Sequence, residues 1–250
     1  MKIVVVGGTG LIGTQVIAHL GEAGHDAVAA APSTGVDTLT GEGVDAALAG
    51  ADVVVDVSNS PSFADDDVLR FFTTSTRILL DAEERAGVRH HVALSIVGAD
   101  RNPDSGYLRA KVAQEELIRS GGVPWTVVRA TQFFEFAPRI ADGATVDGVV
   151  RIPPVGFQPI ASADVARFVA EAAAGEPRRE AYDIAGPERV RFDEFIAGAL
   201  AASGDAREVV ADPAAPYFGA VLADDSIVPQ GEARLGAVTY ADFTAARATA

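Results

Sequence analysis

The amino-acid sequence predicts an α/β protein in which a doubly wound parallel sheet carries helices on both faces. Two observations predict this fold. Short, continuous apolar runs alternate along the chain with longer segments of helical periodicity, and the first apolar run ends directly in a cluster of glycines. Parallel strands are buried on both faces and are joined by helices, so alternation of this kind is typical of parallel sheets.

The apolar runs mark the expected strands. The first run, residues 2–6, reads KIVVV and stops at Gly7, as a buried strand does. Further strands are predicted over residues 26–31, 36–39, 52–57, 89–96 and 124–129. Apolar residues at helical spacing predict helices over residues 11–23, 44–48, 64–86 and 106–119.

The pattern changes after residue 130. Glycines, prolines and short strands dominate there, and two further helices are predicted near residues 163–174 and 192–202. We therefore expect a core over residues 1–130 and a small C-terminal lobe over residues 131–250. No low-complexity linker separates them, and the lobe is expected to pack on the core and to be interleaved with its last strands.

Composition excludes several classes of function. The chain has a formal net charge of −15 and no cysteine. The charge disfavours binding to nucleic acid or to an anionic membrane, and the lack of cysteine excludes disulfides, thiolate nucleophiles and thiolate metal sites. The apolar run after Lys2 is too short for an export signal, and no stretch approaches the ~18–20 apolar residues of a membrane span. We expect a soluble, cytoplasmic protein, and its oligomeric state is left open.

No metal site is expected either. The consecutive residues Asp65, Asp66 and Asp67 open a predicted helix, where negative charge interacts favourably with the helix dipole. Adjacent residues on a helix do not converge on one ion. His90 and His91 begin a predicted strand, so they point to opposite faces of the sheet.

Glycines at positions 7, 10 and 13 lie between the first strand and the first helix. A pyrophosphate group needs a tight turn, a backbone that it can approach closely, and free N–H groups at a helix N-terminus. Glycine supplies the first two because it has no Cβ. The strand–turn–helix context therefore predicts a dinucleotide-binding, Rossmann-type core over residues 1–130.

The second strand bears on the choice between NAD and NADP. An acidic residue at its end would bind the ribose hydroxyls of NAD, and a nearby arginine would bind the 2′-phosphate of NADP. This chain has neither: Ser33 and Thr34 follow the strand, and no cation occurs between Lys2 and Arg70. We therefore expect NAD(P)(H) with a preference for NAD(H). Asp37 is either an adenine contact or a solvated loop residue.

Tyr107 and Lys111 are four residues apart, so on a helix they lie on one face, one turn apart. Ser95 ends a preceding strand, and all three can converge at the carboxyl edge of the sheet, where open α/β sheets bind ligands. A tyrosine is a poor acid or base at neutral pH unless its phenolate is stabilised, and an adjacent ammonium lowers its pKa. The alternative is that Tyr107 and Lys111 merely decorate an amphipathic helix.

The GGTGxxG form of the glycine turn resembles the atypical, NmrA-like branch of the short-chain dehydrogenase/reductase superfamily. The resemblance extends through residues 57–59, 122–129, 158–160, 164–166 and 182–187. It implies an NAD(P) cofactor, with Ser95 orienting the substrate, Tyr107 donating or removing the proton, and Lys111 tuning Tyr107 and anchoring the nicotinamide ribose. An asparagine that the superfamily often adds from the helix after the fourth strand is absent, since Asn59 and Asn102 lie outside it.

The motif and the resemblance together assign binding residues. The expected nucleotide contacts are Gly7, Thr9, Gly10, Leu11, Ile12, Gly13, Ser33, Asp37, Val57, Ser58, Asn59 and Lys111. In the family the segment Gln132-Phe133-Phe134 passes the nicotinamide and enters the substrate pocket. Its rings either bind a flat, apolar substrate or form an ordinary aromatic core stripe. Phe157, Tyr217 and Phe218 are candidates for a lid, although the sequence does not position them.

Three functional hypotheses follow. The first is an NAD(P)-dependent oxidoreductase that moves a hydride between nicotinamide and a carbonyl, quinone or polycyclic aromatic substrate, with residues 131–250 as the substrate-binding lobe. The second is a non-catalytic, NmrA-like NAD(P) redox sensor. The third is an isomerase, dehydratase or oxygenase that uses the same fold on an aromatic intermediate. The intact serine–tyrosine–lysine set favours the first, with a small molecule as the partner.

Overall fold

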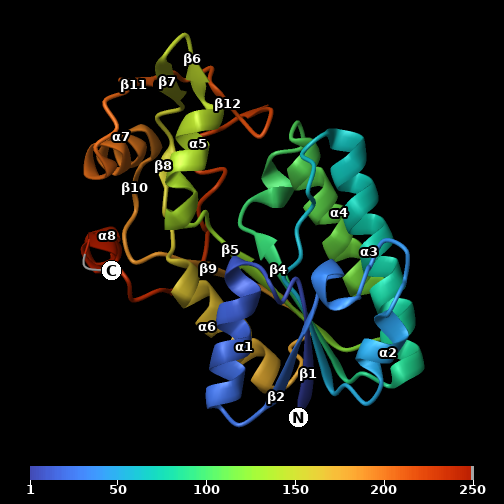
Figure 1. The fold of residues 1–250 in the computed structure, drawn as a ribbon. Helices are drawn as coiled ribbons and strands as arrows, with labels where there is room; N and C mark the ends of the chain where they lie inside the picture. Colours follow the sequence, from blue (N-terminus) through green and yellow to red (C-terminus); the bar gives the residue numbers. More distant parts are fainter. Residues whose placement is uncertain (249–250) are drawn as a thin grey trace.

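The computed structural model describes residues 1–248 and is built around one seven-stranded sheet (Figure 1). The strand order is β14-β9-β5-β4-β3-β1-β2, and every neighbouring pair is parallel. The strands are β1 (Lys2–Val6), β2 (Asp26–Ala30), β3 (Val53–Asp56), β4 (His90–Ile96), β5 (Trp125–Ala130), β9 (Ala181–Ala185) and β14 (Ala233–Leu235). The predicted doubly wound, Rossmann-type fold is confirmed.

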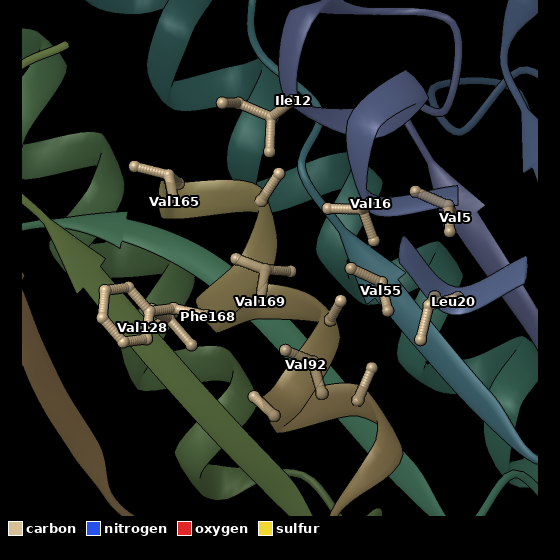
Figure 2. Close-up of a cluster of buried hydrophobic side chains, with 14 of the residues drawn as sticks. Val5, Ile12, Val16, Leu20, Val55, Val92, Val128, Val165, Phe168 and Val169 are labelled. Atoms are coloured by element: carbon tan, nitrogen blue, oxygen red, sulfur yellow. The ribbon is translucent and has the colours of Figure 1, made fainter. Parts of the chain in front are cut away.

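Helices cover both faces of this sheet. They are α1 (Leu11–Glu22) and α6 (Ser162–Ala174) on one face, and α2 (Val44–Leu48), α3 (Asp65–Ala86) and α4 (Gly106–Ser120) on the other. Strand residues alternate between the two faces, so Val5 packs against α1 and α6 while Val4 and Val6 pack against α2 and α3. Figure 2 shows Val169 of α6 and Val16 of α1 over the valines of the central strands.

The C-terminal lobe lies at the top of Figure 1, and the N-terminus lies at the bottom. The elements of the lobe are α5 (Ala137–Gly143), β6 (Thr145–Val146), β7 (Val149–Ile152), β8 (Gly156–Phe157), β10 (Val190–Arg191), α7 (Phe192–Ser203), β11 (Val209–Ala211), β12 (Pro216–Tyr217), β13 (Ala220–Val221) and α8 (Tyr240–Ala248). It has its own apolar core, in which the rings of Phe157 and Phe192 stack with centroids 4.1 Å apart. Phe157 is thus a core residue of the lobe.

Two strands and one helix from beyond residue 130 join the core. β9 and β14 complete the sheet beside β5, and α6 packs on α1. The chain therefore crosses between core and lobe several times. A division of the chain at residue 130 would separate β9 and β14 from the sheet that they complete, and α6 from the face that it covers.

The predicted strand over residues 36–39 is wrong. The Asp37 carboxylate accepts hydrogen bonds from the backbone N–H groups of Leu39 (2.7 Å) and Thr40 (3.3 Å), and this local pairing holds the segment as a turn. The other predicted strands and helices are observed, each within one residue at either end. Within residues 1–248, no helix combines the length and the apolar character needed to cross a membrane.

Candidate functional site

A cavity of about 630 Å³ opens at the carboxyl edge of the sheet, between the core and the lobe. Its walls come from the ends of β1 to β5, from α4 and from the hairpin of β12 and β13. β1 lies between β2 and β3, so the winding of the chain reverses beside β1, which is where open α/β sheets bind ligands. The predicted site residues that line it are Gly7, Thr9, Gly10, Leu11, Ile12, Asp37, Val57, Ser58, Asn59, Ser95, Tyr107, Lys111, Gln132 and Phe133.

The glycine turn forms one end of the cavity. Gly7 has a φ of +77°, and a Cβ there would lie 2.9 Å from the backbone of Ser58. Gly10 precedes α1 without a side-chain cap, and the first turn of α1 carries no acidic residue. The first N–H groups of a helix have no intrahelical partner. Backbone, helix dipole and open space therefore fit the pyrophosphate of a dinucleotide.

Two of the predicted nucleotide contacts lie outside the cavity wall. Gly13 is buried in α1, where a Cβ would clash with the carbonyl oxygen of Gly7, so its role is close packing of helix against turn. Ser33 is exposed on the short 3₁₀ helix after β2 and is not part of the wall. Asp37 does line the cavity, but its carboxylate caps the turn described above. These placements correct the direct contacts expected for Gly13 and Ser33.

The charge of the cavity wall bears on the nucleotide. Among the described residues that line the cavity, Lys111 is the one with a cationic side chain, and it lies at the far end from β2. The end of β2 therefore offers no cation to a 2′-phosphate. No cluster of three or more potential metal-ligating side chains occurs within residues 1–248.

Tyr107 forms the other end of the cavity. Its hydroxyl donates a hydrogen bond to Oδ1 of Asn59 (3.1 Å), on the loop after β3. Burial raises the pKa of Tyr107 to about 12, against the lowering effect of this hydrogen bond. This rise in pKa is opposite to the lowering that an adjacent ammonium would cause. Tyr107 therefore keeps its proton at neutral pH. The helix after β3 carries no asparagine. The hydrogen-bond partner of Tyr107 is instead Asn59, on the loop before that helix.

Lys111 is buried below Tyr107, with 3% of its surface exposed. Its Nζ donates to the carbonyl oxygen of Leu94 (2.9 Å) and to Oε1 of Gln114, whose Nε2 in turn donates to Asp56 (2.9 Å). Burial lowers the pKa of Lys111 to about 8, although Asp56 and Glu115 favour its charged form. Two of its three donors are therefore paired within the protein.

Ser95 lines the cavity, but its proton is engaged elsewhere. The Ser95 hydroxyl donates to Oε1 of Glu115 (2.6 Å). Glu115 is buried and also accepts hydrogen bonds from Nε of Arg129 at 3.0 and 3.2 Å. In this arrangement Ser95 has no free proton for a substrate carbonyl.

The segment after β5 divides between cavity and core. Gln132 and Phe133 line the cavity, and Phe133 stacks on Phe136, which also lines it. Phe134 is only 3% exposed and packs in the lobe against Phe195 at 6.1 Å. The prediction that Phe134 contacts substrate is wrong, because the 3₁₀ turn over residues 134–136 directs it into the core of the lobe.

Sequence reasoning named Tyr217 and Phe218 as candidates for a lid but could not position them, and the structure places both on the β12–β13 hairpin. Tyr217 and Phe218 both line the cavity, and the ring of Phe218 stacks on that of Tyr107 with centroids 5.0 Å apart. The two segments are more than a hundred positions apart in the chain. No local pattern signals such a contact, since it depends on how the lobe sits on the core.

Comparisons with known proteins agree with this geometry. The sequence model of a family described as NAD(P)H-binding matches residues 7–176. The chain is 32% identical to the (4-alkanoyl-5-oxo-2,5-dihydrofuran-3-yl)methyl phosphate reductase of Streptomyces griseus, over 78% of this chain and 71% of that protein. It is 29% identical to the NAD(P)H azoreductase of Xenophilus azovorans, over 81% and 74%. The UDP-glucose 4-epimerase of Thermus thermophilus, solved with NAD, has the same fold, with a TM-score of 0.69 at 20% identity over 99% and 93%.

Proposed function

Because the chain belongs to the NAD(P)H-binding family, in the atypical, NmrA-like branch of the short-chain dehydrogenases/reductases, we propose that it is an NAD(P)-dependent reductase of a carbonyl, quinone or polycyclic aromatic substrate. The predicted resemblance to this branch is confirmed. Residues of the core would hold the dinucleotide, and the lobe would supply one wall of the substrate site.

One observation carries the proposal: a protonated phenol, that of Tyr107, shares a continuous cavity with the glycine turn. A dinucleotide bound on that turn supplies a hydride from its reduced nicotinamide. Tyr107 is protonated at neutral pH, so it would donate a proton to the substrate oxygen rather than abstract one. For this step the Tyr107 hydroxyl exchanges its hydrogen bond to Asn59 for one to the substrate oxygen, and Lys111 supports the floor of the site through Leu94.

The cavity wall supports the substrate class. Besides Tyr107, five aromatic side chains line the cavity, namely Phe71, Phe133, Phe136, Tyr217 and Phe218. Such walls bind flat, apolar molecules and leave a few polar groups to orient them. Both curated relatives described above carry the name of a reductase, which favours reduction as the direction.

The test is oxidation of NADH and NADPH by the purified protein across a panel of quinones, aromatic ketones and unsaturated lactones. We expect Tyr107→Phe to lose about a thousandfold in kcat while keeping its affinity for the dinucleotide, since general acid catalysis contributes about 10²- to 10⁴-fold. Tyr182→Phe is the matched control, because Tyr182 lies on β9 outside the cavity. Equal rates for wild type and Tyr107→Phe would refute the assignment.

We propose NAD(H) as the preferred cofactor, on the lack of a cation at the end of β2 within residues 1–248. A second candidate function is the redox sensor. It is favoured by one observation: the Ser95 hydroxyl and two donors of Lys111 are bound by acceptors within the protein. A sensor would bind dinucleotide with no turnover of any member of the panel.

A further inference from the structure

The β12–β13 hairpin reaches from the lobe to Tyr107. Its strands pair antiparallel, with Tyr217 opposite Ala220. The two tip residues, Phe218 and Gly219, have φ values of +47° and +84°, the left-handed conformation of a tight hairpin turn. Asn, Asp or Gly is favoured at the first of these positions, and a bulky residue there is strained. Phenylalanine at a strained tip calls for a compensating interaction.

Aromatic contacts supply that compensation. The Phe218 ring stacks on Tyr107 at 5.0 Å and on Phe63 at 5.8 Å between centroids. Tyr217 meets Phe218 edge to face at 4.6 Å and Phe192, in the core of the lobe, at 5.3 Å. The hairpin is therefore fixed on both sides, and the ring of Tyr217 is held in one orientation beside the cavity.

The hydroxyl of Tyr217 forms no hydrogen bond within residues 1–248. The side chain lines the cavity. Burial raises the pKa of Tyr217, and the nearby Tyr107 raises it further, so Tyr217 carries a proton at neutral pH. A donor in a largely apolar cavity is stabilised by a ligand that accepts its hydrogen bond.

The end of the cavity that contains Tyr107, which we call the reaction end, lacks the free serine donor that the sequence led us to expect. The proton of Ser95 is bound by Glu115, and Tyr107 supplies only one hydrogen bond to a substrate oxygen. A carbonyl oxygen has two lone pairs and accepts two. Among the described residues, Tyr217 is the other phenol on the cavity wall, and it comes from the lobe, whereas Ser95 comes from β4 of the sheet.

We propose that Tyr217 is a second catalytic donor, which hydrogen-bonds the same substrate carbonyl oxygen that Tyr107 protonates. The inference rests on the proposed reductase function. In the step the carbonyl carbon receives the hydride, the C–O π electrons move onto the oxygen, and the oxygen takes the proton of Tyr107, which is left as phenolate. Tyr217 keeps its proton throughout and stabilises the negative charge that develops on the oxygen. The substrate is accordingly a ketone or quinone whose oxygen is open to donors on both sides.

The test is Tyr217→Phe, which removes one oxygen atom. We expect kcat/KM for naphthoquinone to fall about thirtyfold, within the range for loss of one hydrogen bond to a developing oxyanion. The dissociation constant of the dinucleotide and the thermal midpoint should not change, because the hydroxyl forms no hydrogen bond within residues 1–248. Tyr182→Phe again serves as the matched control. A Tyr217→Phe enzyme within twofold of wild type, beside an inactive Tyr107→Phe enzyme, would overturn this inference and leave the proposed function intact.

Phe218→Asn tests the positioning of Tyr217. Asparagine suits the left-handed tip, so the hairpin should keep its fold while the ring contacts are lost. We expect kcat/KM to fall about tenfold, and the double variant with Tyr217→Phe to be no worse than Tyr217→Phe alone. Additive losses in the double variant would contradict positioning through Tyr217.

A binding measurement covers the case in which the wild type reduces nothing, which would refute the proposed function. Calorimetric titration of naphthoquinone into protein saturated with oxidised NAD gives the dissociation constant without turnover. Weaker binding by Tyr217→Phe than by wild type, about fivefold, would support the hydrogen bond on its own. Equal affinities, or no binding by wild type, would overturn it.

Discussion

The two ends of the cavity are built in different ways. The glycine-turn end is made by the backbone of residues 7–13, a single short segment between β1 and α1. The reaction end is made by side chains from separate segments, with Asn59 after β3, Tyr107 on α4 and Tyr217 on a hairpin of the lobe. A backbone site depends on local conformation, whereas a side-chain site depends on partners that the fold brings together. Substitutions at the two ends should therefore fail in different ways.

At the backbone end, we expect Gly13→Ala to have the largest effect on folding. Its Cβ would clash with the carbonyl oxygen of Gly7 and approach Gly8 Cα to 2.6 Å. Overpacking of this kind lowers the free energy of unfolding by about 3 kcal/mol. The displaced turn should also weaken NADH binding at least tenfold. Denaturant unfolding and calorimetry with NADH measure the two effects.

Gly21→Ala is the matched control for this prediction. Gly21 lies on the same helix, α1, and a Cβ there meets no atom within 4 Å. Replacing an unconstrained helical glycine by alanine should raise the free energy of unfolding by about 0.5 kcal/mol. If both variants behaved alike, the tight packing of the glycine turn would not be what shapes the phosphate site.

At the reaction end, the buried charge of Lys111 predicts a pH-dependent stability difference. The folded-state pKa of Lys111 is lowered to about 8, below the ordinary value of 10.5, so burial opposes folding while the side chain is protonated. The resulting loss of folding stability is fully present below about pH 8 and disappears as the pH rises toward 10.5. Relative to Lys111→Met, the wild type should therefore gain about 2 kcal/mol between pH 7 and pH 10. Urea unfolding of both proteins across this range measures it, and a constant difference would contradict a buried ammonium at Lys111.

The sequence predicted the backbone end well because its signal is local. Glycine spacing, apolar runs and helical periodicity correctly placed β1, α1 and the glycine turn between them. Gly13 was expected to contact the nucleotide directly, but it does not line the cavity. The types of the side chains that we propose as catalytic were also visible in the sequence. Their partners were not, because the hydrogen bond from Tyr107 to Asn59 and the stacking of Phe218 join segments far apart in the chain. The predicted strand over residues 36–39 failed for a local reason, the turn capped by Asp37.

The choice of nucleotide gives a smaller prediction. Ser33 lies exposed just after β2, close in sequence to the cavity residues Ala31 and Pro32. We expect Ser33→Arg to raise the affinity for NADPH about tenfold relative to NADH, because one charge-assisted contact to the 2′-phosphate contributes about 1.5 kcal/mol. Ser33→Gln is the uncharged control of comparable reach. An unchanged NADPH to NADH ratio in Ser33→Arg would place the adenosine ribose away from the end of β2.

The smallest effect on activity is expected for Ser95→Ala, although the motif singled this serine out. Because its proton is bound by Glu115, its loss should lower the free energy of unfolding by about 1 kcal/mol and change kcat/KM less than threefold. Tyr217→Phe should show the reverse pattern, with activity lost and stability kept. The pair thus separates a serine that supports the buried Glu115–Arg129 ion pair from a phenol that serves the substrate. A large loss of kcat in Ser95→Ala at unchanged stability would mean that dinucleotide binding releases the Ser95 hydroxyl from Glu115, and the donor would then be the serine after all.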